Sequence, residues 1–158
     1  MGTRSNTGRS PCRCPLIRRD PPGAPDFVLS YKNNFITVNI NPESNPDIVA
    51  DACNLLLPND NFSVYFSSHT IEHVHDVNKF FTEAYRVLQT NGLMITICPN
   101  RLLHQHSDKV AIGETCFNDF TPDELMVYVQ KNFPNLFEVV QFNTRNNNFD
   151  FDLILRKK

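Results

Sequence analysis

The residues best suited to chemistry in this 158-residue chain lie in one run, HTIEH at residues 69–73. Its H-x-x-E-H spacing is that of an inverted zinc peptidase motif, in which two histidines one helical turn apart hold the metal. Such a site needs a long helix and a third ligand, whereas here a strand-like run leads into His69 and a helix is predicted only after Asp76. The sequence therefore predicts no metal site. His69 and His73 remain either pocket-lining side chains or a histidine base that removes a proton.

Short polar side chains also follow two strand-like runs. Asp51 comes directly after the apolar residues 48–50, and Ser67 and Ser68 follow the strand predicted at residues 62–66. Open parallel sheets present ligands with groups just past the carboxyl ends of their strands, so these three residues are candidates for a binding site. Two structural alternatives stay open: Asp51 as the cap of a turn, and the serines as an ordinary strand end.

Alternating strand-like and helix-like segments must position these residues, and they indicate an α/β fold with a mostly parallel sheet. Helices are predicted at residues 77–88, capped by Asp76, and from Thr121, where TPDE is a capping box with proline at the first helical position. Gly92 is expected to supply the left-handed residue after the first helix. The expected strands cover residues 35–40, 47–50, 62–66 and 93–98, with a C-terminal antiparallel hairpin of residues 137–142 and 149–155.

Composition divides the chain in two. Residues 1–26 mix arginine and proline with few large apolar side chains, which is typical of a disordered tail, and residues 27–158 are expected to form one domain. A formal charge of -2 gives no general attraction to nucleic acid. The sequence has no apolar run of about 18 residues and no secretory signal, so we expect no membrane partner and a cytoplasmic location. Five cysteines without C-x-x-C spacing indicate reduced thiols.

Four segments in order resemble class I S-adenosylmethionine (SAM)-dependent methyltransferases with a type-11 methyltransferase domain. They are VNINPE at residues 38–43, PDIVADA at 46–52, SSHTIEHV at 67–74, and YRVL at 85–88, which continues through NGL at 91–93 to PN at 99–100. The resemblance implies a Rossmann-like domain with SAM across the carboxyl strand ends. It also implies that the Asp51 carboxylate accepts a hydrogen bond from the adenine amino group of SAM and that Ala52 and Cys53 flank the adenine ring. By the same resemblance, Ser67 and Ser68 border the methionine part of SAM. The methyl acceptor and the oligomeric state are not indicated.

The sequence departs from that family in three ways. No G-x-G turn follows a predicted strand, so the nest for the methionine carboxylate is missing and the domain reads as N-terminally truncated. Asn39 stands where the family carries an acid for the ribose hydroxyls, which weakens that contact. The central strand is missing too; only residues 27–31 could fill its place, antiparallel to residues 35–40, or the gap stays unfilled. We therefore expect a SAM-dependent methyltransferase-like protein with impaired or no SAM binding; the alternative is a non-catalytic binding protein or remnant of such a domain.

Overall fold

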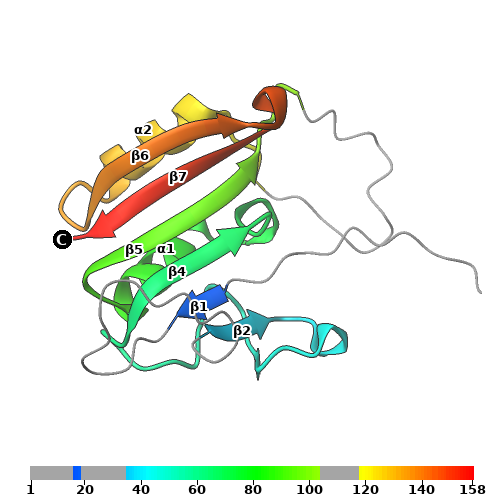
Figure 1. The fold of residues 1–158 in the computed structure, drawn as a ribbon, viewed down its shortest axis with the longest axis vertical. Helices are drawn as coiled ribbons and strands as arrows, with labels where there is room; N and C mark the ends of the chain where they lie inside the picture. Colours follow the sequence, from blue (N-terminus) through cyan, green and yellow to red (C-terminus); the bar gives the residue numbers. More distant parts are fainter. Residues whose placement is uncertain (1–15, 19–34, 104–117) are drawn as a thin grey trace, which may run out of the picture.

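The fold belongs to the α/β class, with one mixed β-sheet and helices on one of its faces. The computed structural model describes residues 16–18, 35–103 and 118–158. The described strands are β1 (Leu16–Arg18), β2 (Phe35–Asn39), β3 (Ile48–Val49), β4 (Phe62–Ser68), β5 (Leu88–Pro99), β6 (Phe137–Arg145) and β7 (Asp150–Lys157). They form one sheet in the order β3-β2-β1-β4-β5-β7-β6 (Figure 1). Five strands share one direction, and β1 and β7 run against them. The Rossmann-like class and the C-terminal hairpin of β6 and β7 are confirmed.

The place of the central strand is taken by β1, which pairs antiparallel with both β2 and β4. Leu16 lies opposite Thr37 on one side and Phe66 on the other. From the sequence we expected residues 27–31 to fill this place, or the place to stay empty. Residues 27–31 lie outside the described part of the chain. Three residues of the expected tail therefore join the sheet. Their backbone N–H and C=O groups face two strand edges that would otherwise lack partners.

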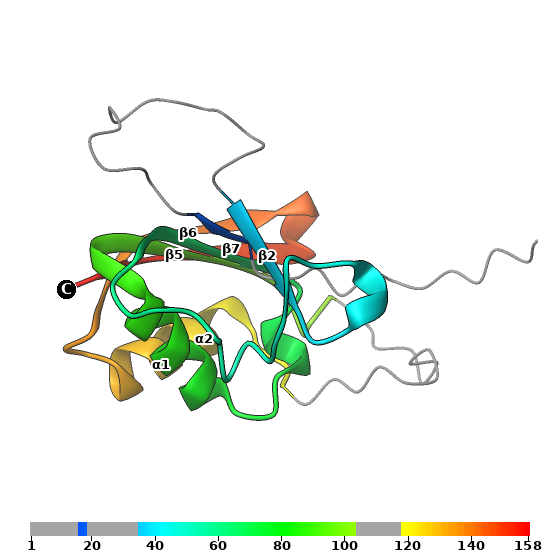
Figure 2. The ribbon, with the colours of Figure 1, turned by 90° about the horizontal axis from the view of Figure 1, so that it is seen from below.

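Both described helices, α1 (Val77–Val87) and α2 (Pro122–Asn132), lie against the same face of the sheet (Figure 2). In α1 the buried side chains are spaced by three and four residues: Val77, Phe80, Phe81, Ala84 and Val87. The predicted caps are confirmed, because the Asp76 carboxylate accepts from the backbone N–H of Lys79 at 3.0 Å, and Thr121 and Glu124 form the capping box of α2. Neither helix has the length and apolarity that a membrane crossing requires.

Aromatic rings fill the space between the helices and the sheet. The ring of Phe80 meets that of Tyr65 edge-on, with 5.8 Å between centroids. The ring of the neighbouring Phe81 packs on that of Phe133, with 5.3 Å between centroids. The ring of Tyr85 packs edge-on against that of Phe137, with 5.6 Å between centroids. Such pairs contribute beyond their buried area. The core thus joins α1 to β4, to the end of α2 and to the start of β6.

The segment that follows α1 differs from the sequence-based expectation. Asn91 and Gly92 lie within β5, and the left-handed residue is Asn91, with φ 65°, rather than Gly92. Glycine is required at position 92 because other backbone atoms approach it closely. A Cβ there would lie 2.8 Å from the carbonyl oxygen of Gln89 and 3.2 Å from that of Phe62, where the register of β4 on β5 shifts. The prediction that Gly92 supplies the left-handed residue after the helix was wrong.

The last strand is anchored by a buried lysine. Nζ of Lys157, a residue that is 5% exposed, donates to Oδ1 of Asp60 at 2.6 Å, to the carbonyl oxygen of Tyr85 at 2.8 Å and to that of Leu88 at 2.7 Å. It also lies 4.2 Å from the centroid of the Tyr85 ring. All three ammonium donors therefore have partners. The contacts tie the end of β7 to the α1–β5 junction.

The loop between β3 and β4 is held to α1 by an ion pair. Nε of Arg86 donates to Oε1 of Glu83 at 2.7 Å, and Nη2 donates to Oε2 at 2.8 Å. The same guanidinium donates to the carbonyl oxygens of Leu55 and Leu57 and to Oδ1 of Asn59. Oε2 of Glu83 also accepts from the backbone N–H of Leu55 at 2.7 Å. The hydrogen bonds from Arg86 hold the pKa of the Glu83 carboxyl below its ordinary value.

Replacing Lys157 by methionine tests the buried anchor. We expect K157M to lower the free energy of unfolding by about 2–4 kcal/mol, because it leaves two main-chain carbonyls without their donor. Urea unfolding followed by circular dichroism measures the change. The adjacent K158M is the matched control, since Lys158 is exposed, and should change stability by less than about 0.5 kcal/mol. Equal effects of the two variants would contradict the assignment.

Replacing Gly92 by alanine tests the close approach of backbone atoms to this position in β5. We expect G92A to destabilise the protein by about 1–3 kcal/mol, because the new methyl group meets backbone atoms that cannot move aside. N91G is the control, because glycine accepts the left-handed conformation without strain, and should stay within about 1 kcal/mol. Thermal or urea unfolding of both variants gives the comparison. An unchanged stability of G92A would show that the backbone around position 92 moves aside for the new methyl group.

Removing the charge of Glu83 tests the ion pair. At pH 7 we expect E83Q to lower the free energy of unfolding by about 1–2 kcal/mol, a range discounted for the partial exposure of this surface pair. The pKa of the Glu83 carboxyl is lower in the folded protein than in the unfolded chain, where it is about 4.3. The ion pair therefore stabilises the protein above that pH, and this stabilisation is lost as the pH falls through the pKa of the folded state. Wild type should therefore lose more stability than E83Q between about pH 5 and pH 3.

The control for this ion pair is E138Q, which removes a carboxylate from the exposed pair with Arg156. It should leave stability at pH 7 within about 0.5 kcal/mol of wild type. Urea titrations at several pH values measure both variants. Parallel pH profiles for wild type and E83Q would rule out the proposed linkage.

Candidate functional site

The predicted site residues lie along one edge of the sheet. Strands β2, β3, β4 and β5 end at this edge, as the arrowheads of β2, β4 and β5 show in Figure 1. Asn39 is the last residue of β2, and Ser68 is the last of β4. Asp51 and His69 follow β3 and β4 by two residues and one residue. The fold therefore brings the candidates from separate parts of the sequence to a common edge, where α/β sheets bind their ligands.

At the end of β2, the amide of Asn39 is already engaged within the chain. The residue is 8% exposed, and its Oδ1 accepts from the backbone N–H of Asn41 at 2.9 Å. Oδ1 of Asn41 in turn caps the short turn η1 (Pro42–Ser44) by accepting from the backbone N–H of Glu43. The main-chain oxygen of Asn39 accepts from Ala50 at 3.1 Å. The Asn39 side chain thus shapes the chain's exit from β2.

Past β3, Asp51 caps a turn. Its Oδ1 accepts from the backbone N–H of Cys53 at 2.8 Å, and its main-chain oxygen accepts from Asn54 at 2.9 Å. The carboxylate is exposed, and its second oxygen takes no part in this bond. Ala52 is half-buried beside it. The turn-capping alternative that the sequence left open is therefore realised, and it uses one of the two carboxylate oxygens.

Neither described cysteine is suited to nucleophilic chemistry. The Cys53 thiol donates to the main-chain oxygen of Asp76 at 3.3 Å, and burial followed by the charge of Asp51 raises the pKa of Cys53 to about 11. Cys98 lies fully buried in β5, and burial, with the charges of Glu72 and Asp150, raises the pKa of its thiol well above the ordinary value. Both thiols stay protonated near neutral pH.

The two serines at the end of β4 are buried. Ser67 shares a short hydrogen bond with the hydroxyl of Thr96 on the neighbouring strand β5, and both residues are at most 1% exposed. Side chains alternate along a strand, so Ser67 points to the helix-covered face, as Tyr65 does. Ser68 is 3% exposed, and its main-chain oxygen accepts from the Thr70 hydroxyl at 3.3 Å. A role for either serine beside a cofactor stays a prediction.

Beyond β4, the H-x-x-E-H run lies on the short turn η2 (Ile71–His73) and not on a long helix. Oε1 of Glu72 lies 3.4 Å from Nδ1 of His69 and 3.9 Å from Nε2 of His73. His69 has a left-handed backbone with φ 52°, and its N–H donates to the carbonyl oxygen of Ile97 at 2.9 Å. A histidine in this conformation is uncommon, and such residues concentrate at functional sites.

The structure adds one residue that the sequence analysis missed. Oδ1 of Asp150, the first residue of β7, lies 3.7 Å from Nε2 of His69. Nothing local marks Asp150, because it reaches the edge only through the pairing of β7 with β5, which sets Asp150 opposite Pro99. Within the described ranges, no group of three or more His, Cys, Asp or Glu side chains is placed to hold a metal ion.

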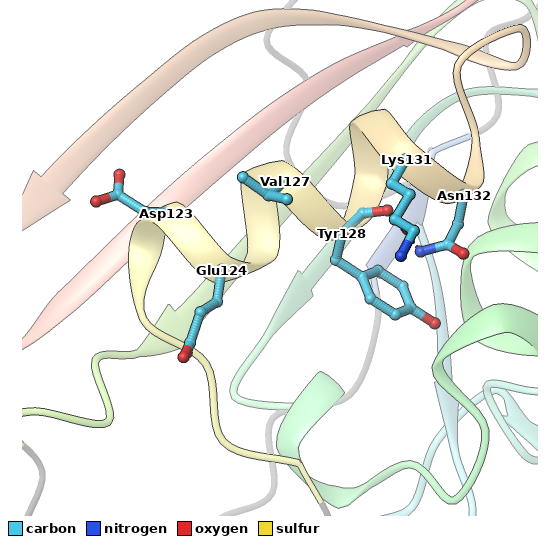
Figure 3. Close-up of a pocket in the computed structure, with 6 residues that line it drawn as sticks. All are labelled: Asp123, Glu124, Val127, Tyr128, Lys131 and Asn132. Atoms are coloured by element: carbon cyan, nitrogen blue, oxygen red, sulfur yellow. Dashed lines mark hydrogen bonds between the residues drawn. The ribbon is translucent and has the colours of Figure 1, made fainter.

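A separate hollow on the outer surface of α2 is not the candidate site. It has a volume of about 550 Å³, and the described residues that line it all belong to that helix, as Figure 3 shows: Asp123, Glu124, Val127, Tyr128, Lys131 and Asn132. A wall made by one helix leaves a ligand open to solvent, whereas ligand sites enclose most of the ligand surface. None of the predicted site residues lines it.

Comparisons with known proteins agree with this fold. The type-11 family model described as a methyltransferase domain matches residues 27–96. A SAM-dependent methyltransferase from Thermotoga maritima is 21% identical, with a TM-score of 0.55, and the match covers 70% of this chain and 64% of that one. One from Mesorhizobium loti is 14% identical, with a TM-score of 0.61, over 76% and 78% of the two chains. The [4+2]-cyclase SpnF is 13% identical, with a TM-score of 0.54, over 70% and 55%.

These likenesses establish the fold and not a shared reaction, because the identities are low and one of the three proteins is named a cyclase. This chain spans less than two thirds of the length of the Thermotoga protein. No curated protein sequence matches it. The family model over residues 27–96, the strand order and the solved structures point to the same conclusion: the described part of this chain has the fold of class I methyltransferase domains.

Proposed function

We propose that this chain is a SAM-dependent methyltransferase-like protein whose own described residues bind SAM weakly. The observation that carries the proposal is that the polar groups expected to hold SAM are engaged in internal hydrogen bonds. Oδ1 of Asn39 accepts from Asn41, Oδ1 of Asp51 accepts from Cys53, and the Ser67 hydroxyl is paired with Thr96. A group that must first give up an internal bond contributes less to ligand affinity.

The described residues do not fit the methionine half of SAM. A carboxylate is ordinarily received by free backbone N–H groups in a glycine-rich turn before a helix. Within the described ranges the single glycine is Gly92, which lies within β5. The strand that would lead into such a turn is replaced by the antiparallel β1. The methionine carboxylate therefore has no receiving group in this part of the chain.

The adenosine half fits better, though only in part. Asp51 is exposed at the strand ends and keeps one carboxylate oxygen for an amino group. Ala52 and Cys53 beside it are half-buried, which suits contact with a flat ring. Asn39 presents a neutral amide in place of an acid, and neutral hydrogen bonds are about half as strong as charge-assisted ones. These contacts support weak binding of the nucleoside.

The alternative is a non-catalytic binding protein that keeps the methyltransferase-type sheet. The same internal hydrogen bonds favour it, because they leave the edge of the sheet stable without a cofactor. The two functions differ in their response to SAM. Only the first requires saturable binding at the strand ends.

Titration of the folded chain with SAM by calorimetry separates the two. We expect a dissociation constant between about 0.1 and 1 mM, where binding contributes only about 4–5 kcal/mol. N39D should tighten binding up to about tenfold by restoring the charged ribose partner, and D51N should weaken it. N132D adds the same charge on α2 and should leave the affinity unchanged.

Saturable binding below about 10 µM would contradict impaired binding. No saturable heat for wild type and N39D, with native circular dichroism, would overturn the SAM-dependent function and leave the non-catalytic alternative. Equal tightening by N39D and N132D would point to a general charge effect instead of a ribose contact.

A further inference from the structure

The step from Asn91 to Gly92, near the start of β5, is the one Asn-Gly pair in the sequence. The side-chain amide carbon of an asparagine lies within reach of the main-chain nitrogen of the next residue, and a bond between them closes a five-membered ring. A side chain on the next residue hinders this approach, whereas glycine has none. Asn91 and Gly92 therefore have the composition for a reaction with each other that needs no catalyst.

The amide of Asn91 is open to solvent. Asn91 is exposed, as are the two residues before it, Gln89 and Thr90. Among the hydrogen bonds of the described residues, none involves the Asn91 side chain. The amide of Asn100, by contrast, donates to the main-chain oxygen of Asn148 at 3.1 Å. A side chain without such a bond rotates freely, so the amide carbon of Asn91 can turn toward the main chain.

Two other asparagines share the conformation and the exposure of Asn91. The backbone is left-handed at Asn45, Asn91 and Asn148, with φ of 52°, 65° and 70°, and all three residues are exposed. They differ in the residue that follows, which is proline after Asn45, phenylalanine after Asn148 and glycine after Asn91. Proline has no N–H to give up, and phenylalanine is bulky. Only at Asn91 is the next nitrogen both protonated and unhindered.

We propose that Asn91 is a site of spontaneous deamidation, which converts it to isoaspartate and aspartate. The main-chain nitrogen of Gly92 bonds to Cγ of Asn91, and the bond from Cγ to Nδ2 breaks. The side-chain nitrogen leaves as ammonia and takes the proton of the Gly92 N–H. Water then opens the cyclic imide: cleavage at Cγ gives aspartate, and cleavage at the main-chain carbon gives isoaspartate. The reaction consumes one water, releases one ammonia and requires no SAM, so it goes beyond the proposed function.

Isoaspartate at this place changes the course of the main chain. The chain then runs through the former side chain and is longer by one carbon atom. Space is lacking there, since a Cβ on Gly92 would lie 2.8 Å from the carbonyl oxygen of Gln89 and 3.2 Å from that of Phe62. The next residue, Leu93, already pairs with Val64 of β4 on one side and with β7 on the other. We therefore expect isoaspartate, but not aspartate, to destabilise the sheet.

Incubation of the whole folded chain at mildly alkaline pH, followed by peptide mapping with mass spectrometry, tests this inference. Electron-transfer fragmentation separates isoaspartate from aspartate. We expect both products to accumulate at Asn91 while Asn45 and Asn148 stay unmodified. The rate should rise with pH, because the attacking nitrogen must lose its proton. Native circular dichroism at each time point shows that the folded chain is the species that reacts.

Two variants separate the chemical step from its effect on stability. N91G removes the reacting amide, so its urea midpoint should not change on incubation, whereas incubated wild type should gain a population that unfolds at lower urea. N91D, measured without incubation, supplies the aspartate product and should unfold at the wild-type midpoint, because aspartate also tolerates the left-handed conformation.

An unmodified Asn91 in the folded chain, under conditions in which the urea-unfolded chain reacts, would overturn the proposal. Equal modification of Asn91 and Asn148 would overturn it as well, because the glycine would then have no effect. A lowered midpoint in fresh N91D would show that the new charge destabilises the protein, and would contradict the effect assigned to the added main-chain atom.

Discussion

The guanidinium of Arg86 is the interaction on which the arrangement of the strand ends depends. It makes five hydrogen bonds, two to Glu83 and three to the loop between β3 and β4. That loop carries Asp51 and Cys53, and the loop has no helix of its own to order it. Fixing irregular backbone costs conformational entropy at every residue, so a rigid partner must compensate. Helix α1 is that partner, because its phenylalanines are buried against the sheet. The core thereby determines where the Asp51 turn lies.

The polar residues that carry the family resemblance serve the fold of this chain. Asn39 directs the chain out of β2, Asp51 caps the next turn, and Ser67 joins β4 to β5 through Thr96. The fully buried Ser67 hydroxyl would otherwise lack a partner, which is costly. A motif can therefore keep its residues while the groups that would hold a ligand become structural. The family pattern indicates the sheet more reliably than it indicates the cofactor.

The two halves of the sheet edge differ in chemistry. At the ends of β2 and β3, Oδ1 of Asn39 and Oδ1 of Asp51 accept hydrogen bonds from within the chain, and the central place between β2 and β4 is closed by the short antiparallel β1. At the ends of β4 and β5, Oε2 of Glu72 is buried without a hydrogen bond from the described residues, and His69 lies between two carboxylates with a left-handed backbone. Strain and unsatisfied groups persist only where the surrounding structure enforces them. The packing around the ends of β4 and β5 therefore holds His69 and Glu72 in this arrangement.

The sequence by itself determined the elements whose signals are local. The apolar spacing in α1, the caps Asp76 and Thr121, and the hairpin of β6 and β7 were all predictable, because each depends on residues a few positions apart. Asn91 rather than Gly92 as the left-handed residue, β1 in the central place, and Asp150 beside His69 were decided by tertiary structure. Strand pairing joins segments distant in the chain, and no local pattern encodes which edge or side chain a strand will meet. Candidate residues such as Asp51 and His69 could therefore be named from the sequence, but the side chains that they contact could not.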